Sequence, residues 1–234
     1  MDKTIALLGG SFNPPHQGHL QMSSYIQKTL CVDETWMLFS INPDKHPDDY
    51  ASLQHRMNMA DILVKHYNAP VVLSDLEDQI AREKGKYDTY YILEGLRERF
   101  PDHKFIWVMG ADSFSTFHTW KERDDIMKDH IIAVVDRPGY TDKALNSQTA
   151  KDFADQMIDL TDPCHLQTAK TGWCFLNSPK IDVSSSGILE NLREGKTDFA
   201  EPFDLVADYI YQHGLYGTAQ IKTIPAQSLS LALS

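Results

Sequence analysis

Apolar runs of strand length recur along the chain, and longer segments with a helical period separate them. The runs lie at residues 4–8, 35–41, 70–74, 104–109, 131–135 and 173–176. Each run is nearly continuous in apolar residues, which is typical of parallel strands buried on both faces. Strands that alternate with helices are joined by right-handed crossovers. The pattern therefore predicts an α/β fold, a Rossmann-like doubly wound parallel sheet with helices on both faces.

Helical stripes mark several of the segments between these runs. Their apolar positions are Leu53, Met57, Ala60, Leu63 and Tyr67, then Ile92, Leu93 and Leu96, then Phe203, Val206, Ala207 and Ile210. Gly214 is expected to end the last of these helices. No repeat or linker divides the chain, so residues 1–217 are expected to form one domain. The tail at residues 218–234 is rich in Ser, Ala and Leu, and it is either disordered or packed on a partner.

The loop after the first predicted strand holds the most informative sequence. It reads Gly-Gly-Ser-Phe-Asn-Pro-Pro-His-Gln-Gly-His at residues 9–19. Gly9 and Gly10 let the backbone turn sharply and approach a ligand, and ligands of open parallel sheets bind at the carboxyl ends of the strands. His16 and His19 flank the expected start of a helix. Free N–H groups and imidazoles there can hold a phosphate and the charge that develops when it is transferred.

Two other interpretations of this loop compete with phosphate transfer. One is a tight turn that carries two incidental histidines. The other is a metal site made from His16 and His19, but no third ligand lies near them in the sequence. The ten-residue pattern Gly-x-Phe-x-Pro-x-His-x-Gly-His is restrictive and favours the phosphate site. In that site, Gly18 would leave room for a nucleotide against the helix.

The net charge of −11 limits the ligands that this loop is expected to bind. A broad nucleic-acid surface needs clustered Lys and Arg, so we expect no nucleic-acid partner. A small anion remains compatible, because helix N-termini and a few cations make a locally positive pocket. No apolar run approaches the roughly 18 residues of a membrane span, and Cys31, Cys164 and Cys174 have no paired spacing. A cytoplasmic protein is expected, without a membrane partner.

Two further clusters are expected at the same edge of the sheet. Gly110 and Asp112 follow a predicted strand, and Asp112 either caps the next helix or contacts a nucleotide. A serine run precedes a helix expected at residues 187–194, and it consists of Ser184, Ser185 and Ser186. Serines at a helix start are usually caps, but three together also offer hydroxyl and N–H groups to an anion.

The first loop resembles the signature of the nucleotidyltransferase superfamily with a His-x-Gly-His motif, and within it the bacterial nicotinate-mononucleotide adenylyltransferases. The resemblance extends to about Gly217. Further matching positions are His55, Arg56, Met59, the run at residues 109–113, Trp120, and the runs at residues 137–139, 184–186 and 209–216. The loop is specific for the superfamily, whereas the spacing from Gly110 through Trp120 to Arg137 points to the nicotinate-nucleotide branch.

The resemblance implies an enzyme of NAD biosynthesis that joins nicotinate or nicotinamide mononucleotide to the AMP moiety of ATP and releases pyrophosphate. The implied catalytic residues are His16 and His19. The implied ATP-binding residues are Gly9, Gly10, Ser11, Phe12, Gly18, Gly110, Asp112, Ser184, Ser185 and Ser186. The implied mononucleotide-binding residues are Asn42, Lys45, Asp88, Trp120 and Arg137. Mg²⁺ is expected to bridge the ATP phosphates without a metal site of the protein's own, and a homo-oligomer is compatible with the sequence.

Three positions leave roles open. Trp120 either stacks on the pyridine ring or packs in the core. Asp88 follows Tyr87 where the family has Thr, and an acid there would repel a ring carboxylate, so the choice between nicotinate and nicotinamide is open. Leu189 stands where the family has an arginine. Arg193, four residues later, either reaches back to the serines or pairs with a neighbouring glutamate, Glu190 or Glu194.

Rival functions remain at this point. One is a nucleotidyltransferase for another phosphorylated acceptor. The region from Trp120 to Arg137 argues against this possibility. A class I aminoacyl-tRNA synthetase shares the loop type, but it would need a much longer chain and a basic surface. A regulatory module that binds nucleotide without turnover is the alternative of a different class, and Leu189 favours it. Pyrophosphate release from ATP and a mononucleotide would separate these possibilities.

Overall fold

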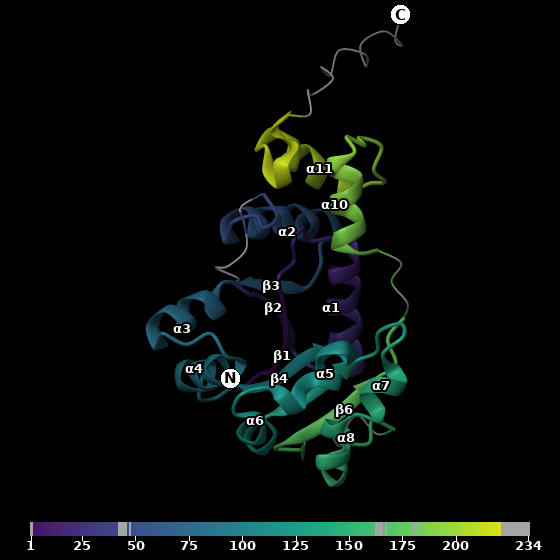
Figure 1. Ribbon diagram of the computed structural model, residues 1–234. Helices are drawn as coiled ribbons and strands as arrows, with labels where there is room; N and C mark the ends of the chain where they lie inside the picture. Colours follow the sequence, from purple (N-terminus) through teal and green to yellow (C-terminus); the bar gives the residue numbers. More distant parts are fainter. Residues whose placement is uncertain are drawn as a thin grey trace, which may run out of the picture.

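The computed structural model describes residues 2–41, 46, 48–161, 166, 168–179, 181 and 183–220. Six parallel strands form one sheet in the order β3-β2-β1-β4-β5-β6 (Figure 1). Their bounds are β1 Thr4–Gly10, β2 Glu34–Phe39, β3 Val71–Ser74, β4 Lys104–Gly110, β5 Ile131–Val135 and β6 Gly172–Leu176. The order reverses between β1 and β4, which are neighbours in space. The predicted doubly wound sheet is confirmed. The first and last residues of the strands differ from the predicted ones by at most a few residues.

Helices fill the connections between the strands. Their bounds are α1 Gln17–Thr29, α2 Leu53–Tyr67, α3 Leu76–Lys84, α4 Thr89–Arg99, α5 Ala111–Thr116, α6 Arg123–Asp129, α7 Thr141–Leu145, α8 Gln148–Asp152, α10 Ser185–Arg193 and α11 Phe203–Gln212. Short 3₁₀ turns are η1 Phe117–Thr119, η2 Ala154–Gln156 and η3 Leu215–Gln220. Figure 1 shows α1 on one side of β1 and β2, and α3 with α4 on the other. The expected cover of both faces is therefore present.

The alternation of side chains along β1 explains the two-sided core. Ile5 and Leu7 point to the face covered by α3, α4 and α5, where they join a cluster with Trp107 of β4. Ala6 points to the opposite face and packs with Ile26 of α1. Both faces of the sheet are buried because helices lie on each of them. The sequences of the strands are therefore nearly continuous apolar runs.

A third hydrophobic cluster lies where the first loop meets the last helices. Phe12 of the loop packs there with Met59 of α2, Leu192 of α10 and Ile210 of α11. Figure 1 shows these three helices gathered beyond the carboxyl ends of β1 and β2. The cluster thus packs α10 and α11 against the loop that follows the first strand.

The buried side chain of Asn13 ties this loop to two distant segments. Its Nδ2 donates to the carbonyl oxygen of Asp49 at 2.8 Å. Its Oδ1 accepts from the backbone N–H of Ala51 at 3.1 Å and from the Tyr216 hydroxyl at 2.9 Å. Buried amides are costly unless hydrogen-bonded, so these three bonds define one position for the loop.

Arg56 on α2 also binds the first loop through hydrogen bonds. Its Nη1 donates to the carbonyl oxygen of Ser11 at 2.5 Å, and its Nε donates to the carbonyl oxygen of Ala51 at 3.0 Å. The guanidinium lies 4.5 Å from the centre of the Tyr50 ring, and the residue is only 1% exposed. Arginine keeps its charge when buried, so a fixed cation lies beneath the loop.

Packing continues for at least one residue beyond Gly217, the predicted end of the domain. Thr218 is buried, and its hydroxyl donates to the carbonyl oxygen of Leu215 at 2.8 Å. Residues 221–234, most of the expected tail, lie outside the described residues. The boundary between a domain at residues 1–217 and a tail at 218–234 stays a prediction. Within the part of the chain that the structure describes, no helix is long and apolar enough to cross a membrane.

Replacing Tyr216 by phenylalanine is expected to destabilise the fold. The change removes a buried donor from Asn13 Oδ1, which should lower the free energy of unfolding by about 1 kcal/mol. Urea unfolding of the Tyr216→Phe variant measures this loss. Tyr67→Phe is the matched control, because it removes an exposed hydrogen bond to Gln17 and should change stability by less than about 0.5 kcal/mol. Equal effects of the two variants would contradict the anchoring role of Tyr216.

Candidate active site

The two histidines of the first loop stack on each other at the start of α1. His16 is the N-cap residue and has extended backbone angles, φ −148° and ψ 168°. Its backbone N–H donates to Nδ1 of His19 at 3.1 Å. The ring centroids are 3.8 Å apart with an interplanar angle of 28°. The helix start therefore fixes both imidazoles in one stacked pair.

Burial keeps this pair uncharged near neutral pH. It lowers the pKa of His16 to about 4. It also lowers the pKa of His19 well below the ordinary value, and the neighbouring His16 contributes in the same direction. Because His19 Nδ1 accepts a hydrogen bond, the proton of the neutral ring lies on Nε2. His19 can thus donate from Nε2, while His16 Nδ1 is buried and has no hydrogen-bond partner within the described part of the chain.

Gly18 makes the stacked arrangement sterically possible. A Cβ atom at this position would lie 3.0 Å from ring atoms of His16 and 2.6 Å from a methyl group of Ile181. From the sequence, we expected the space beside Gly18 to accommodate a nucleotide. The structure fills it with the His16 ring and Ile181, so a direct contact between Gly18 and ATP stays a prediction.

Asp112 and Arg137 connect the carboxyl ends of β4 and β5. Gly110 is the N-cap residue of α5, so Asp112 lies inside the first turn and does not cap the helix. Its Oδ2 accepts a hydrogen bond from Arg137 Nη1, within an ion pair. Its Oδ1 is buried and has no hydrogen-bond partner among the described residues. A residue assigned to ATP and one assigned to the mononucleotide therefore meet at the carboxyl ends of two neighbouring strands, β4 and β5.

The serines bring the start of α10 to the first loop. Ser184 caps the helix, because its Oγ accepts from the Gly187 N–H at 3.2 Å. Ser185 Oγ donates to the carbonyl oxygen of Pro14 at 2.9 Å. Ser186 is exposed. The capping interpretation is confirmed for Ser184, and the cross-link through Ser185 places a second helix N-terminus beside the histidine pair.

Arg193 does not replace the missing family arginine. Its Nη2 donates to Asp49 Oδ1 at 2.5 Å and approaches the Asp48 carbonyl oxygen at 3.3 Å. Both earlier interpretations were wrong, because the side chain neither reaches the serines nor pairs with a glutamate of its own helix. Leu189 packs against the third hydrophobic cluster, where an arginine would have to bury its charge.

A pocket of about 160 Å³ opens at the carboxyl ends of β1 and β2, between the first turns of α3 and α4. Its lining residues are Gly9, Gly10, Ser40, Glu77, Tyr87, Thr89, Ile92 and Trp107. Burial raises the pKa of Glu77 to about 7, although the charge of Arg56 opposes the shift. The sequence analysis missed Glu77. Its place three residues after β3 was the available signal, because that is where site residues of parallel sheets lie.

Asp88 borders this pocket through its two neighbours, whereas Trp120 is not among the lining residues. Asp88 is the N-cap residue of α4, between two residues that line the pocket, and its Oδ1 lies 3.2 Å from Lys121 Nζ. Trp120 is half-buried and packs beside Phe117, with ring centroids 5.2 Å apart. The core-packing interpretation of Trp120 thus holds in part. Asn42 and Lys45 lie outside the described residues.

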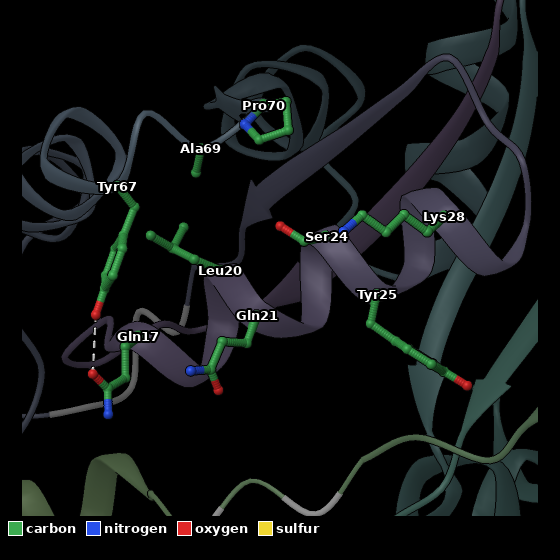
Figure 2. Close-up of a pocket in the computed structure, with 9 residues that line it drawn as sticks. All are labelled: Gln17, Leu20, Gln21, Ser24, Tyr25, Lys28, Tyr67, Ala69 and Pro70. Atoms are coloured by element: carbon green, nitrogen blue, oxygen red, sulfur yellow. Dashed lines mark hydrogen bonds between the residues drawn. The ribbon is translucent and has the colours of Figure 1, made fainter.

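A separate hollow of about 460 Å³ lies along the outer side of α1 (Figure 2). Its lining residues are Gln17, Leu20, Gln21, Ser24, Tyr25, Lys28, Tyr67, Ala69 and Pro70. The Tyr67 hydroxyl donates to Gln17 Oε1 at 3.1 Å across one end of it. None of the predicted site residues lines this hollow, so the predicted chemistry is not located there.

Comparison with known proteins agrees with this geometry. Residues 7–191 match the family described as cytidylyltransferase-like. A protein of Cereibacter sphaeroides named "probable nicotinate-nucleotide adenylyltransferase" is 36% identical over 185 residues, which cover 79% of this chain and 95% of that protein. A protein of the same name from Methylorubrum extorquens is 37% identical over 186 residues, which cover 79% and 97%.

A solved structure has the same fold. Nicotinic acid mononucleotide adenylyltransferase of Plasmodium falciparum, complexed with NaAD, superimposes with a TM-score of 0.65 over 92% of this chain and 98% of that one, at 21% identity. The family match spans both histidines, the Asp112–Arg137 pair and most of α10. The chain therefore belongs to the cytidylyltransferase-like family and, within it, to the nicotinate-nucleotide adenylyltransferases.

Proposed function

We propose that the protein joins nicotinate or nicotinamide mononucleotide to the AMP moiety of ATP and releases pyrophosphate, as a step of NAD biosynthesis. The observation that carries the proposal is the stacked, uncharged pair of His16 and His19 at the start of α1. The names of the curated relatives support the same reaction. A donor at a helix N-terminus beside the end of a first parallel strand is suited to a phosphoryl group.

The reaction needs little proton chemistry from the protein. An oxygen of the mononucleotide phosphate attacks the α-phosphorus of ATP, the new P–O bond forms, and the bond to pyrophosphate breaks in line. The attacking phosphate is already anionic near neutral pH, so no general base is required. The histidines stay uncharged and donate hydrogen bonds to the α-phosphoryl oxygens, whose charge grows in the transition state. Catalysis is then mainly positioning and charge stabilisation.

The two substrates occupy different sides of the first loop in this proposal. The phosphates of ATP lie between the starts of α1 and α10, where Ser185 joins the two segments. The pyridine ring enters the 160 Å³ pocket, whose walls include Trp107 and Ile92 and whose volume suits one aromatic ring. Asp88 borders that pocket, and Lys121, the residue after Trp120, pairs with Asp88. The assignment of Asp88 and Trp120 to the mononucleotide stays part of the proposal.

Mg²⁺ is proposed to enter with ATP. No group of three or more potential metal ligands of the His, Cys, Asp or Glu type exists within the described residues. Such a surface suits a hydrated ion held mainly by phosphate oxygens, which is how Mg²⁺ usually binds nucleotides. The ion would offset charge on the phosphates. The expected homo-oligomer also stays a prediction.

Pyrophosphate release tests the proposed function directly. The protein is incubated with ATP and Mg²⁺, and with either mononucleotide or with another phosphorylated acceptor. Release that requires a pyridine mononucleotide, together with formation of the dinucleotide, is the expected result. Tight nucleotide binding without release would favour the regulatory alternative and overturn the proposal.

Loss of the His19 donor is expected to slow the reaction strongly. One preorganised donor to transition-state charge contributes about 10²–10³ in turnover, so His19→Ala should lower kcat by that factor. His66→Ala is the control, because His66 is an exposed residue on α2, outside the site, and its loss should leave kcat unchanged. Circular dichroism checks that both variants fold. Near-normal turnover of His19→Ala would remove this residue from the mechanism.

The histidine pair is also expected to resist protonation. Nitrogen-15 NMR of the imidazoles should show His16 titrating near pH 4 in the folded protein and at the ordinary histidine value in urea. The unfolded chain then binds protons that the folded chain does not. The free energy of unfolding should therefore fall as the pH drops from about 6.5 toward 4. A His16 midpoint near 6.5 in the folded state would show that the pair is solvated.

A further inference from the structure

Glu77 presents a carboxyl group to the pocket without a partner of its own. The residue lies in the first turn of α3, is half-buried and lines the 160 Å³ pocket. Among the residues that the structure describes, none forms a hydrogen bond or ion pair with its side chain. A carboxyl group left unpaired in a cleft is typical of a ligand-binding position.

The walls around Glu77 are suited to a flat ring with a polar substituent. Trp107 and Ile92 provide apolar surfaces, and the backbone of Gly9 and Gly10 closes one side. A Cβ atom at Gly9 would lie 2.7 Å from the Trp107 ring, so the glycine allows the indole to pack flat against the strand. Trp107 Nε1 is buried and has no hydrogen-bond partner within the described chain. The pocket therefore combines apolar ring and side-chain surfaces with an unpaired carboxyl group.

Among the described residues, few charged and titratable groups lie near Glu77. Arg56 of α2 faces it and favours its ionised form, whereas burial favours its neutral form. Tyr50 faces it from the segment before α2, and burial raises the pKa of that phenol. Tyr87 lines the pocket from the segment before α4. The stacked histidines stay uncharged above pH 6, because burial lowers the pKa of each. Of these described groups, Glu77 is thus the one whose pKa lies near neutral pH.

We propose that Glu77 distinguishes between the two substituents of the pyridine ring. When it is ionised, it accepts a hydrogen bond from the NH₂ of a carboxamide. When it is protonated, it donates a hydrogen bond to a ring carboxylate. The proposal rests on the placement of the pyridine ring under the proposed function. Two carboxylates in one small pocket repel each other, so an ionised Glu77 disfavours the nicotinate form. The protein then accepts both mononucleotides and shifts its preference with pH.

The pH dependence of the preference tests the proposal. The quantity measured is kcat/KM for nicotinate mononucleotide divided by kcat/KM for nicotinamide mononucleotide, between pH 6 and pH 8.5. In this ratio, the ionisation of any group that affects both acceptors equally cancels. Such groups include the mononucleotide phosphate and all groups that bind ATP. It should fall by roughly tenfold per pH unit above pH 7, as the protonated fraction of Glu77 falls.

Three variants separate Glu77 from its neighbours. Glu77→Gln keeps the shape but cannot ionise, so its ratio should be independent of pH and exceed that of the unaltered protein at least tenfold at pH 8.5. Glu83→Gln, which removes an exposed acid on the same helix, should behave as the unaltered protein. Asp88→Asn should retain the pH dependence. Loss of the pH dependence in Asp88→Asn, with its persistence in Glu77→Gln, would transfer the role to Asp88.

Calorimetry of mononucleotide binding without ATP gives a readout besides activity. At pH 7.5, titration in buffers of different ionisation enthalpy should show proton uptake with nicotinate mononucleotide and a small proton release with nicotinamide mononucleotide. A pH-independent ratio without proton uptake, in a protein that makes dinucleotide, would overturn the role of Glu77 and leave the proposed function intact. Failure to release pyrophosphate with either acceptor would instead overturn the proposed function. If Glu77→Gln does not fold, the measurements on the unaltered protein decide.

Discussion

The amide side chain of Asn13 is the constraint on which the rest of the site depends. Its three hydrogen bonds join the first loop to the segment before α2 and to Tyr216 near the end of the chain. The loop contains glycines and prolines and has no regular hydrogen bonds of its own over residues 11–15. These bonds and those of Arg56 add to the contacts at the helix start itself, where the His16 backbone N–H donates to His19 Nδ1. Contacts with residues more than 30 positions away in sequence thus help to place the loop that carries both histidines.

The strands could be predicted because burial on both faces leaves a simple signature. Ile131–Val135 is fully buried and entirely apolar, and its predicted and observed bounds coincide. The start of β2 differs by one residue, because Glu34 belongs to the strand and pairs with Lys3, and the strand ends at Phe39, two residues before the predicted end. Local patterns thus suffice where one physical requirement acts along a whole run. They fail by a residue or two where a side-chain contact extends the run.

The candidate site was only partly accessible from sequence. The first loop carries its chemistry in consecutive residues, so a motif revealed it. Glu77 was missed because an acid in the first turn of a helix is what the helix dipole favours anywhere. Only the fold shows that this acid lines a pocket rather than solvent. Arg193 was misjudged for a related reason, since its partner Asp49 lies 144 residues away and no local pattern indicates such a pair.

Synthesis of the chain proceeds from the N-terminus, and the bond from Ser185 to Pro14 spans 171 residues. The loop with both histidines leaves the ribosome early, while its partners on α10 and Tyr216 follow only when nearly the whole chain has been made. A nascent chain that ends before α10 contains every strand of the sheet but lacks the Ser185 contact to the first loop. The order of synthesis therefore separates formation of the sheet from completion of the contacts around the loop in which, under the proposed function, ATP binds.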